Sequence, residues 1–94
     1  MTRYTVVWDE AVDAHFLDAW IKSDATTRAV LSDFATLVDR TLSVNAETVG
    51  EPQSTEDMRA VVIHVASASV TVHFKVLPAD RIARVTRFVF RPSG

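Results

Sequence analysis

The chain of 94 residues contains no cysteine, only two glycines and three prolines, and no long uninterrupted apolar run. Without cysteine there is neither a disulfide framework nor thiol chemistry, and this composition favours a reducing, cytoplasmic location. No apolar run approaches the roughly 18 residues of a membrane span. The first ten residues lack the apolar stretch of a secretory signal. We therefore expect no membrane association, and the 48% apolar content indicates an ordered globular chain.

The charge balance excludes a general attraction to nucleic acid. Ten basic and twelve acidic residues give a net charge of −2, so any nucleic-acid contact would need a local basic patch. The sequence has no glycine-rich phosphate loop, nucleophile elbow or zinc-finger spacing. No cofactor and no metal are expected, because a zinc site would need a third ligand near His64 and His73, and His15 belongs to the first predicted helix. The length predicts one domain over residues 1–94.

Two helices follow a short strand in the first half of the chain. Residues 4–8 are aromatic and β-branched, which predicts a strand. Asp9 and Asp24 are candidate N-caps for two amphipathic helices. The helical stripes are Val12, Phe16, Ala19 and Trp20, then Val30, Leu31, Phe34, Leu37, Val38 and Leu42. Periodicity is lost over residues 43–57, which predicts a loop.

The last third of the chain predicts three antiparallel strands, at residues 59–66, 70–77 and 82–90. Side chains alternate between two faces in a strand. The predicted apolar face is Ile63, Val65, Val72, Phe74, Val76, Ala83 and Val85. The predicted polar face is His64, Thr71, His73, Lys75, Arg84 and Thr86. The fold class is therefore α+β, in the order β-α-α-β-β-β, with an antiparallel-rich four-stranded sheet and both helices packed on one face.

Turn positions predict the register of these strands. A two-residue loop at Ala68–Ser69 would pair Ser67 with Val70 and place His64 opposite His73. A four-residue turn at residues 78–81 would set the register of the second hairpin. It would pair Leu77 with Ile82, Lys75 with Arg84, and His73 with Thr86. After Val85 the alternation would turn Arg87 inward and Phe88 and Phe90 outward, which predicts a β-bulge or a sheet edge there.

This order of elements resembles the RelE/ParE toxin superfamily of bacterial toxin–antitoxin systems. The resemblance lies in the opening strand at residues 4–8, in Leu42 followed by Gly50, and in residues 70–76 followed by Asp80 and residues 81–85. It implies a role in plasmid stabilisation, an antitoxin partner, and either ribosome-dependent mRNA cleavage (RelE kind) or poisoning of DNA gyrase (ParE kind). The chain departs from the nuclease pattern, with Thr71 where an arginine is usual and no tyrosine or histidine after the last strand.

The residues of the polar face suggest a metal-free endoribonuclease site. Such a site needs a base, an acid and cations for the phosphate. His73 and His64 are the candidate acid–base pair, with Lys75 and Arg84 as charge stabilisers. The alternative is that these side chains simply solvate a sheet face.

Two function classes stay open. Arg59, Arg87 and Arg91 are candidate phosphate contacts, with surface ion pairs as the alternative. The chain is either a toxin that acts on mRNA or gyrase, or a non-catalytic module that binds a protein partner or a second copy of itself. In both classes the helix pair and a sheet edge are expected to bind the partner. The contributing apolar residues would be Val12, Phe16, Trp20 and Val30.

Overall fold

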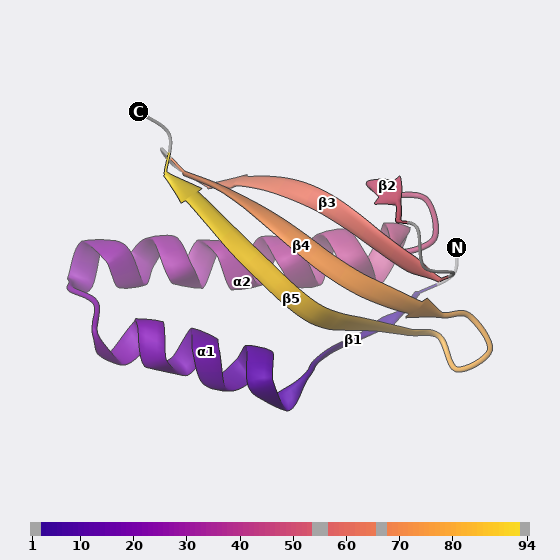
Figure 1. Cartoon of the computed structure of the whole chain (residues 1–94), viewed down its shortest axis with the longest axis horizontal. Coiled ribbons are helices and arrows are strands. Elements are labelled where there is room, and N and C mark those ends of the chain that lie inside the picture. Colours follow the sequence, from indigo (N-terminus) through magenta and orange to yellow (C-terminus); the bar gives the residue numbers. More distant parts are fainter. Residues whose placement is uncertain (1–2, 54–56, 66–67, 93–94) are drawn as a thin grey trace.

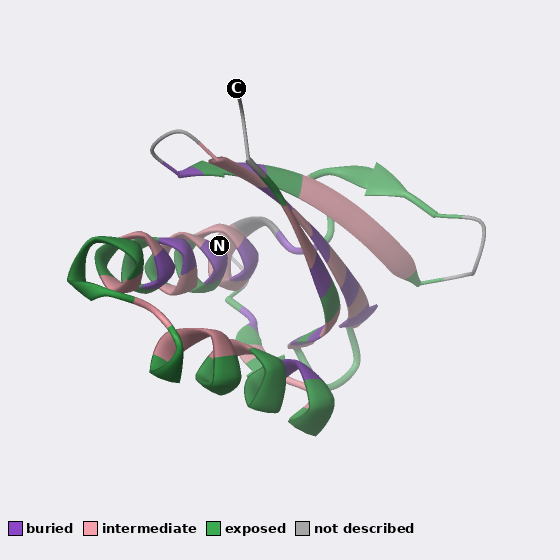
Figure 2. Cartoon of the chain, turned by 60° about the vertical axis from the view of Figure 1, so that its left-hand side comes forward, coloured by how far each residue is buried: buried purple, intermediate pink, exposed green. Residues whose placement is uncertain are grey.

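The computed structural model describes residues 3–53, 57–65 and 68–92, with two helices against one twisted sheet (Figure 1). The strands and helices, in chain order, are β1 (Thr5–Trp8), α1 (Glu10–Ile21), α2 (Ala25–Asn45), β2 (Glu51–Pro52), β3 (Met58–Val65), β4 (Ala68–Leu77) and β5 (Ile82–Pro92). Both helices lie on the same side of the sheet, as predicted (Figure 2). We call the opposite side, which carries His73, Lys75, Arg84 and Arg87, the open face.

The sheet has five strands in the order β1-β5-β4-β3-β2, so the prediction of four strands is wrong. The additional strand, β2, lies within the predicted loop and pairs with Arg59 and Ala60 of β3. The sheet is also mixed rather than purely antiparallel, because β1 pairs in parallel with residues 82–85 of β5. A two-residue strand such as β2 has too few residues to produce an alternation signal, which is why the sequence pattern did not show it.

The two helix starts differ in how they are capped. The Asp24 carboxylate accepts a hydrogen bond from the Thr27 backbone N–H at 2.8 Å, which satisfies one free donor of α2. This bond lowers the pKa of Asp24 below its ordinary value of 3.8. Asp9 occupies the N-cap position of α1, but its side chain makes no capping hydrogen bond. Its carboxylate is therefore available for another partner.

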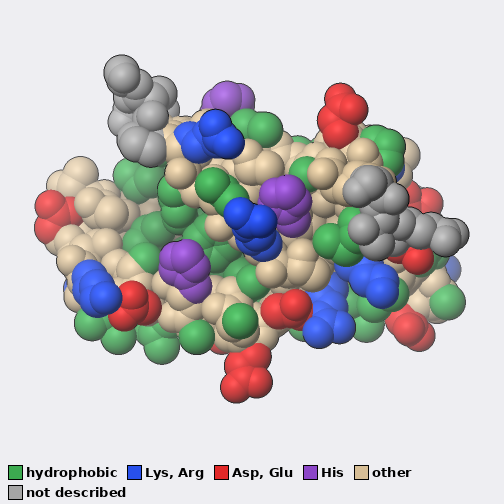
Figure 3. All heavy atoms as spheres, viewed as in Figure 1, with side chains coloured by type: hydrophobic (Ala, Val, Ile, Leu, Met, Phe, Trp, Pro, Cys, Tyr) green, Lys and Arg blue, Asp and Glu red, His purple; other side chains and the backbone are tan. Residues whose placement is uncertain are grey.

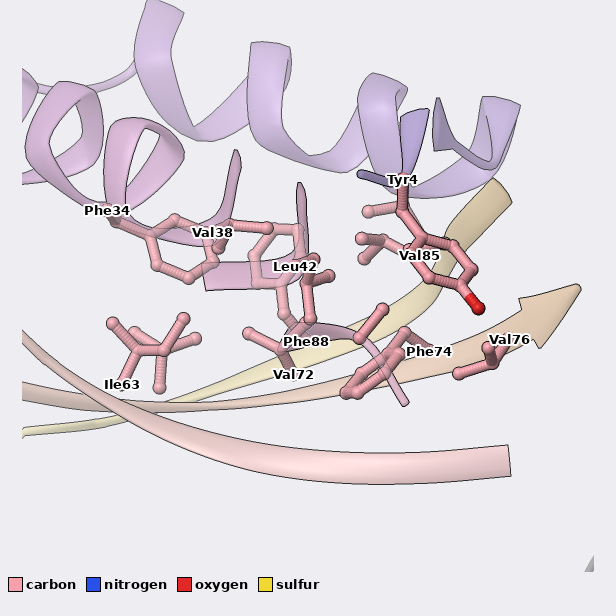
Figure 4. Close-up of a cluster of buried hydrophobic side chains, with 14 of the residues drawn as sticks. Tyr4, Phe34, Val38, Leu42, Ile63, Val72, Phe74, Val76, Val85 and Phe88 are labelled. Atoms are coloured by element: carbon pink, nitrogen blue, oxygen red, sulfur yellow. The ribbon is translucent and has the colours of Figure 1, made fainter. Parts of the chain in front are cut away.

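The core lies between α2 and the inner face of the sheet (Figure 4). Phe34, Val38 and Leu42, one turn apart on α2, are fully buried against the strands. All seven residues of the predicted apolar face are buried as well. Phe34 contacts four other aromatic rings, those of Trp8, Phe16, Phe88 and Phe90. This aromatic cluster fixes α2 and the middle of α1 against β1 and β5.

The hairpin between β3 and β4 has a different register from the predicted one. Val65 pairs with Ala68 and His64 pairs with Ser69, so Ala68 and Ser69 belong to β4 and not to a loop. Ser67 lies outside the described residues, and Val70 pairs with Ile63. The predicted pairing of His64 with His73 is therefore wrong. The shift has an even number of residues, so each side chain stays on its predicted face.

The hairpin between β4 and β5 follows the prediction up to a β-bulge. Leu77 pairs with Ile82 and Lys75 with Arg84, as expected from the turn. The register then shifts, so that His73 lies opposite Arg87 rather than Thr86. Thr86 is the extra residue, and its hydroxyl donates to the His73 carbonyl oxygen at 3.2 Å.

This bulge has a plain cause in the sequence. Ala83 and Val85 are two residues apart, but Phe88 follows three residues later, so one extra residue is needed to bury all three. Arg87 consequently points to the open face and is exposed, while Phe88 is buried. The bulge predicted after Val85 is confirmed.

Candidate nucleic-acid interface and acid–base site

The open face carries two successive cross-strand pairs of basic or titratable side chains. Lys75 lies opposite Arg84, and His73 lies opposite Arg87. Directly opposed residues in antiparallel strands have Cα atoms roughly 4.5–5.5 Å apart, so these four side chains are neighbours. Figure 3 shows histidine, lysine and arginine side chains close together over the strands. Such a group of cations is the usual footprint of a phosphate-binding surface.

Arg84 is not free to the same degree as the other cations. Its Nε donates to a carboxylate oxygen of Asp9, the residue at the N-cap position of α1. The carboxylate relieves the repulsion between Arg84 and Lys75 that their pairing would otherwise create. Among the residues that the structure describes, the only other ion pair joins Lys22 to Asp18. Lys75, Arg87 and Arg91 have no acidic partner among the residues that the structure describes.

The structure places His64 away from His73. His64 pairs with Ser69, which lies four positions before His73 on β4. At about 3.3 Å per residue, this separation is on the order of 13 Å. His64 instead lines a cavity of about 300 Å³ between β3 and α2, together with Asp33, Thr36, Leu37, Arg40 and Val65. The two imidazoles do not share a site.

Arg59 also lies apart from the open face. It pairs with Phe74 and therefore belongs to the side of β3 that faces the helices. Its guanidinium donates to the carbonyl oxygens of Val49 and Gly50, each at 3.0 Å, which holds the segment before β2 against β3. Arg59 also lines a cavity of about 380 Å³ beside β2, whose other walls include Pro52 and Met58. Its contacts are those of a structural residue.

Arg91 extends the line of cations on β5. It lies opposite Ser69, is exposed, and is four residues beyond Arg87 on the same strand. The basic side chains of the open face therefore follow β5 from Arg84 to Arg91, with Lys75 and His73 beside them on β4. Among the described residues, no three histidine or acidic side chains come together to hold a metal ion.

Sequence reasoning missed His15. It is exposed on α1, and its ring lies 5.2 Å from that of Phe88, centre to centre. It lines a cavity of about 160 Å³ together with Ala11, Val12, Thr86, Arg87 and Phe88. Placing a helix residue against a strand requires the packing of α1, which no local pattern encodes. His15 is on the first helix, as predicted, and it shares this cavity with Arg87 of the open face.

Comparison with known proteins gives a likeness of fold. No family model and no curated protein sequence matches the chain. Among solved structures, a free double arginine-to-alanine mutant of the Escherichia coli toxin RelE matches with a TM-score of 0.54 and 17% identity. That match covers 93% of this chain and 82% of the RelE chain. This chain has the fold of the RelE toxin.

A second RelE structure extends the comparison. The same RelE mutant in complex with an antitoxin RelBc peptide matches with a TM-score of 0.51 and 15% identity. That match covers 99% of this chain and 85% of the RelE chain. The RelE fold agrees with the resemblance read from the order of elements. In the described part of the chain, no helix is long and apolar enough to cross a membrane.

Proposed function

We propose that this chain is the toxin of a toxin–antitoxin pair and that it binds and cleaves mRNA on its open face. The observation that carries this proposal is the cross-strand group of His73, Lys75, Arg84 and Arg87 on a RelE fold. The RelE fold supports the toxin class. The clustered cations support RNA as the target, because a chain of net charge −2 attracts nucleic acid only through a local patch.

The chemistry proposed for this face is metal-free phosphodiester transfer. A base takes the proton of the RNA 2′-hydroxyl, and the 2′-oxygen attacks phosphorus. The bond from phosphorus to the 5′-oxygen breaks, and an acid gives that oxygen a proton. The products are a 2′,3′-cyclic phosphate and a 5′-hydroxyl. In this scheme His73 transfers a proton, while Lys75 and Arg87 stabilise the charge that develops on the phosphate oxygens.

An antitoxin partner follows from the same proposal. RelE was solved with a peptide of its antitoxin, and we propose that a short antitoxin segment binds this chain too. Of the apolar residues predicted to contact a partner, Val12 is buried, while Phe16, Trp20 and Val30 are only partly exposed. The large exposed apolar residues of α1 are instead Leu17 and Ile21, which are 57% and 64% exposed.

The second candidate is a module that binds a protein and cleaves nothing. Leu17 and Ile21 favour it, because they are one helical turn apart and give α1 an apolar stripe that faces solvent. The partner would again be a protein segment, or a second copy of this chain. This candidate differs from the first in one respect, since it requires no role for the open face.

Induced expression in bacteria, followed by primer extension on a reporter mRNA, tests the proposal. We expect growth arrest with new mRNA ends, and we expect the purified chain to cleave mRNA alone or on ribosomes. His73→Phe and Arg87→Ala should remove both effects. His64→Phe is the matched control, because it removes an exposed imidazole that lies on the order of 13 Å along the sheet from His73.

The other outcomes identify the alternatives. Growth arrest with intact mRNA and inhibited DNA supercoiling would indicate a gyrase-directed toxin. Absence of both arrest and cleavage, with tight binding to the product of the adjacent gene, would indicate the protein-binding module.

A further inference from the structure

The proposed reaction needs two proton-transfer groups, and the open face supplies one imidazole. His64 is remote, the Asp9 carboxylate is paired with Arg84, and the remaining charged side chains of the face are Lys75, Arg87 and Arg91, which are cations rather than acid–base groups. We propose that His15 is the second acid–base residue and that it acts with His73 on a phosphate held by Arg87. This inference rests on the proposed RNA cleavage and assigns its missing group.

The end of β1 explains how a helix residue reaches the edge of the open face. β1 pairs only with residues 82–85 of β5, and the backbone N–H of Asp9 donates to the Val85 carbonyl oxygen at 3.0 Å. The chain then turns into α1. In the described part of the chain, the remainder of β5 has no partner strand on that side, and residues of the first half of α1 lie beside residues 86–88 of β5.

One arginine, Arg87, neighbours both imidazoles at this edge of the sheet. His15 and Arg87 line the same cavity of about 160 Å³, from α1 and β5 respectively. Arg87 is also the cross-strand neighbour of His73. The volume is many times the roughly 10–15 Å³ that admits one water molecule, so a phosphate group fits there. A phosphate bound by Arg87 would have His15 on one side and His73 on the other.

Two features of the packing fix this arrangement. The ring of His15 lies against Phe88 with an angle of 35° between the ring planes, which restricts its position. The bulge at Thr86 sets the direction of the next two side chains, since it turns Phe88 inward toward the core and Arg87 outward toward His73. A regular strand would have placed Thr86 opposite His73. The bulge is therefore the structural reason that Arg87 neighbours both His15, through the shared cavity, and His73, across the strands.

The charges around each imidazole bear on its pH dependence. From β5, Arg87 faces His15; on its own helix, Asp18 lies one turn away and is paired with Lys22. His73 has Arg87 opposite on β5, uncharged Ala60 opposite on β3, and Lys75 two residues along β4. One imidazole must be neutral and the other protonated for turnover. The rate of cleavage should therefore have a bell-shaped dependence on pH.

The test uses the full chain and a fluorescent RNA substrate. His15→Phe keeps an aromatic ring against Phe88 but removes both ring nitrogens, and thermal unfolding of this variant checks that the fold persists. We expect it to lower the cleavage rate at least about 100-fold with RNA affinity changed by less than about twofold. His73→Phe should have a similar effect, and His64→Phe should cleave as the wild type does.

A modified substrate tells the acid from the base. When sulfur replaces the 5′-oxygen at the cleaved bond, the leaving thiolate needs no proton. Exactly one of the two variants, His15→Phe or His73→Phe, should then regain its rate, and the bell-shaped pH profile should keep one limb in each variant. Rescue of neither or of both would overturn the assignment of His15.

The controls separate this inference from the proposed function. If the wild type cleaves RNA and His15→Phe cleaves equally well, the role of His15 is wrong and the RNA-cleaving function stands. If the wild type binds RNA but never cleaves it, with or without ribosomes, both the cleavage and the role of His15 are wrong.

Discussion

Replacing Asp9 by asparagine should strengthen RNA binding, because the Asp9 carboxylate holds Arg84 away from phosphate. Three cations of the open face, Lys75, Arg87 and Arg91, have no acidic partner among the described residues. For single-stranded nucleic acid, each phosphate contact contributes about 0.7 to the slope of log affinity against log salt concentration. The wild type should therefore show a slope of about −2.1 and Asp9→Asn one of about −2.8. At 0.15 M salt the added contact raises the affinity about fourfold.

The structure indicates that this substitution leaves the fold intact. The Asp9 side chain makes no capping hydrogen bond to α1, and its ion pair with Arg84 is partly exposed and so contributes less than about 1 kcal/mol. The assay is fluorescence anisotropy with a 2′-O-methyl RNA, which cannot be cleaved, over a series of salt concentrations. Asp33→Asn on α2 is the control, since it changes the net charge equally on the other side of the sheet. An unchanged slope in Asp9→Asn, or an equal gain in Asp33→Asn, would refute the reasoning.

Three further predictions concern stability. Gly50→Ala should cost more than about 2 kcal/mol in urea unfolding, because Gly50 has φ +74° and a Cβ there would lie 2.2 Å from the Ala60 carbonyl oxygen; an unchanged midpoint would contradict this. Phe34→Ala removes the centre of the aromatic cluster and should cost about 3–5 kcal/mol, whereas a loss below about 1 kcal/mol would mean that the core is packed differently. Asp24→Ala should lower the melting temperature above pH 4, and the difference from wild type should vanish as the pH falls through the lowered pKa of Asp24. A difference that persists in strong acid would exclude the Thr27 hydrogen bond as its cause.

Much of the fold could be predicted from the sequence, because its signals are local. The apolar stripe of α2 and the alternation of β4 identify their elements directly, and the turn after Leu77 fixed the pairing of Lys75 with Arg84. The phase change from Val85 to Phe88 predicted the bulge. The register of the first hairpin was predicted wrongly because its turn has no clear local signal. Residues 66–69 are alternating alanine and serine and contain no glycine or asparagine to mark the turn.

The candidate site could be predicted only in part, because its remaining contacts are non-local. The ion pair between Asp9 and Arg84 joins residues 75 positions apart in the sequence. The parallel pairing of β1 with β5 sets where α1 begins, and this in turn places His15 beside Phe88. A helical pattern identifies which residues share a face of α1 but not which strand that face contacts.

The most direct test of the central claim is an NMR titration of the isotope-labelled chain with a 2′-O-methyl RNA. If RNA binds the open face over β4 and β5, the amide and imidazole signals of His15, His73, Lys75 and Arg87 will shift together with one binding constant. The amide signals of Asp33 and Thr36, which are exposed on α2 on the other side of the sheet, will stay in place. Shifts confined to His64 and to the exposed stripe of α1, or no shifts at all, would contradict the account.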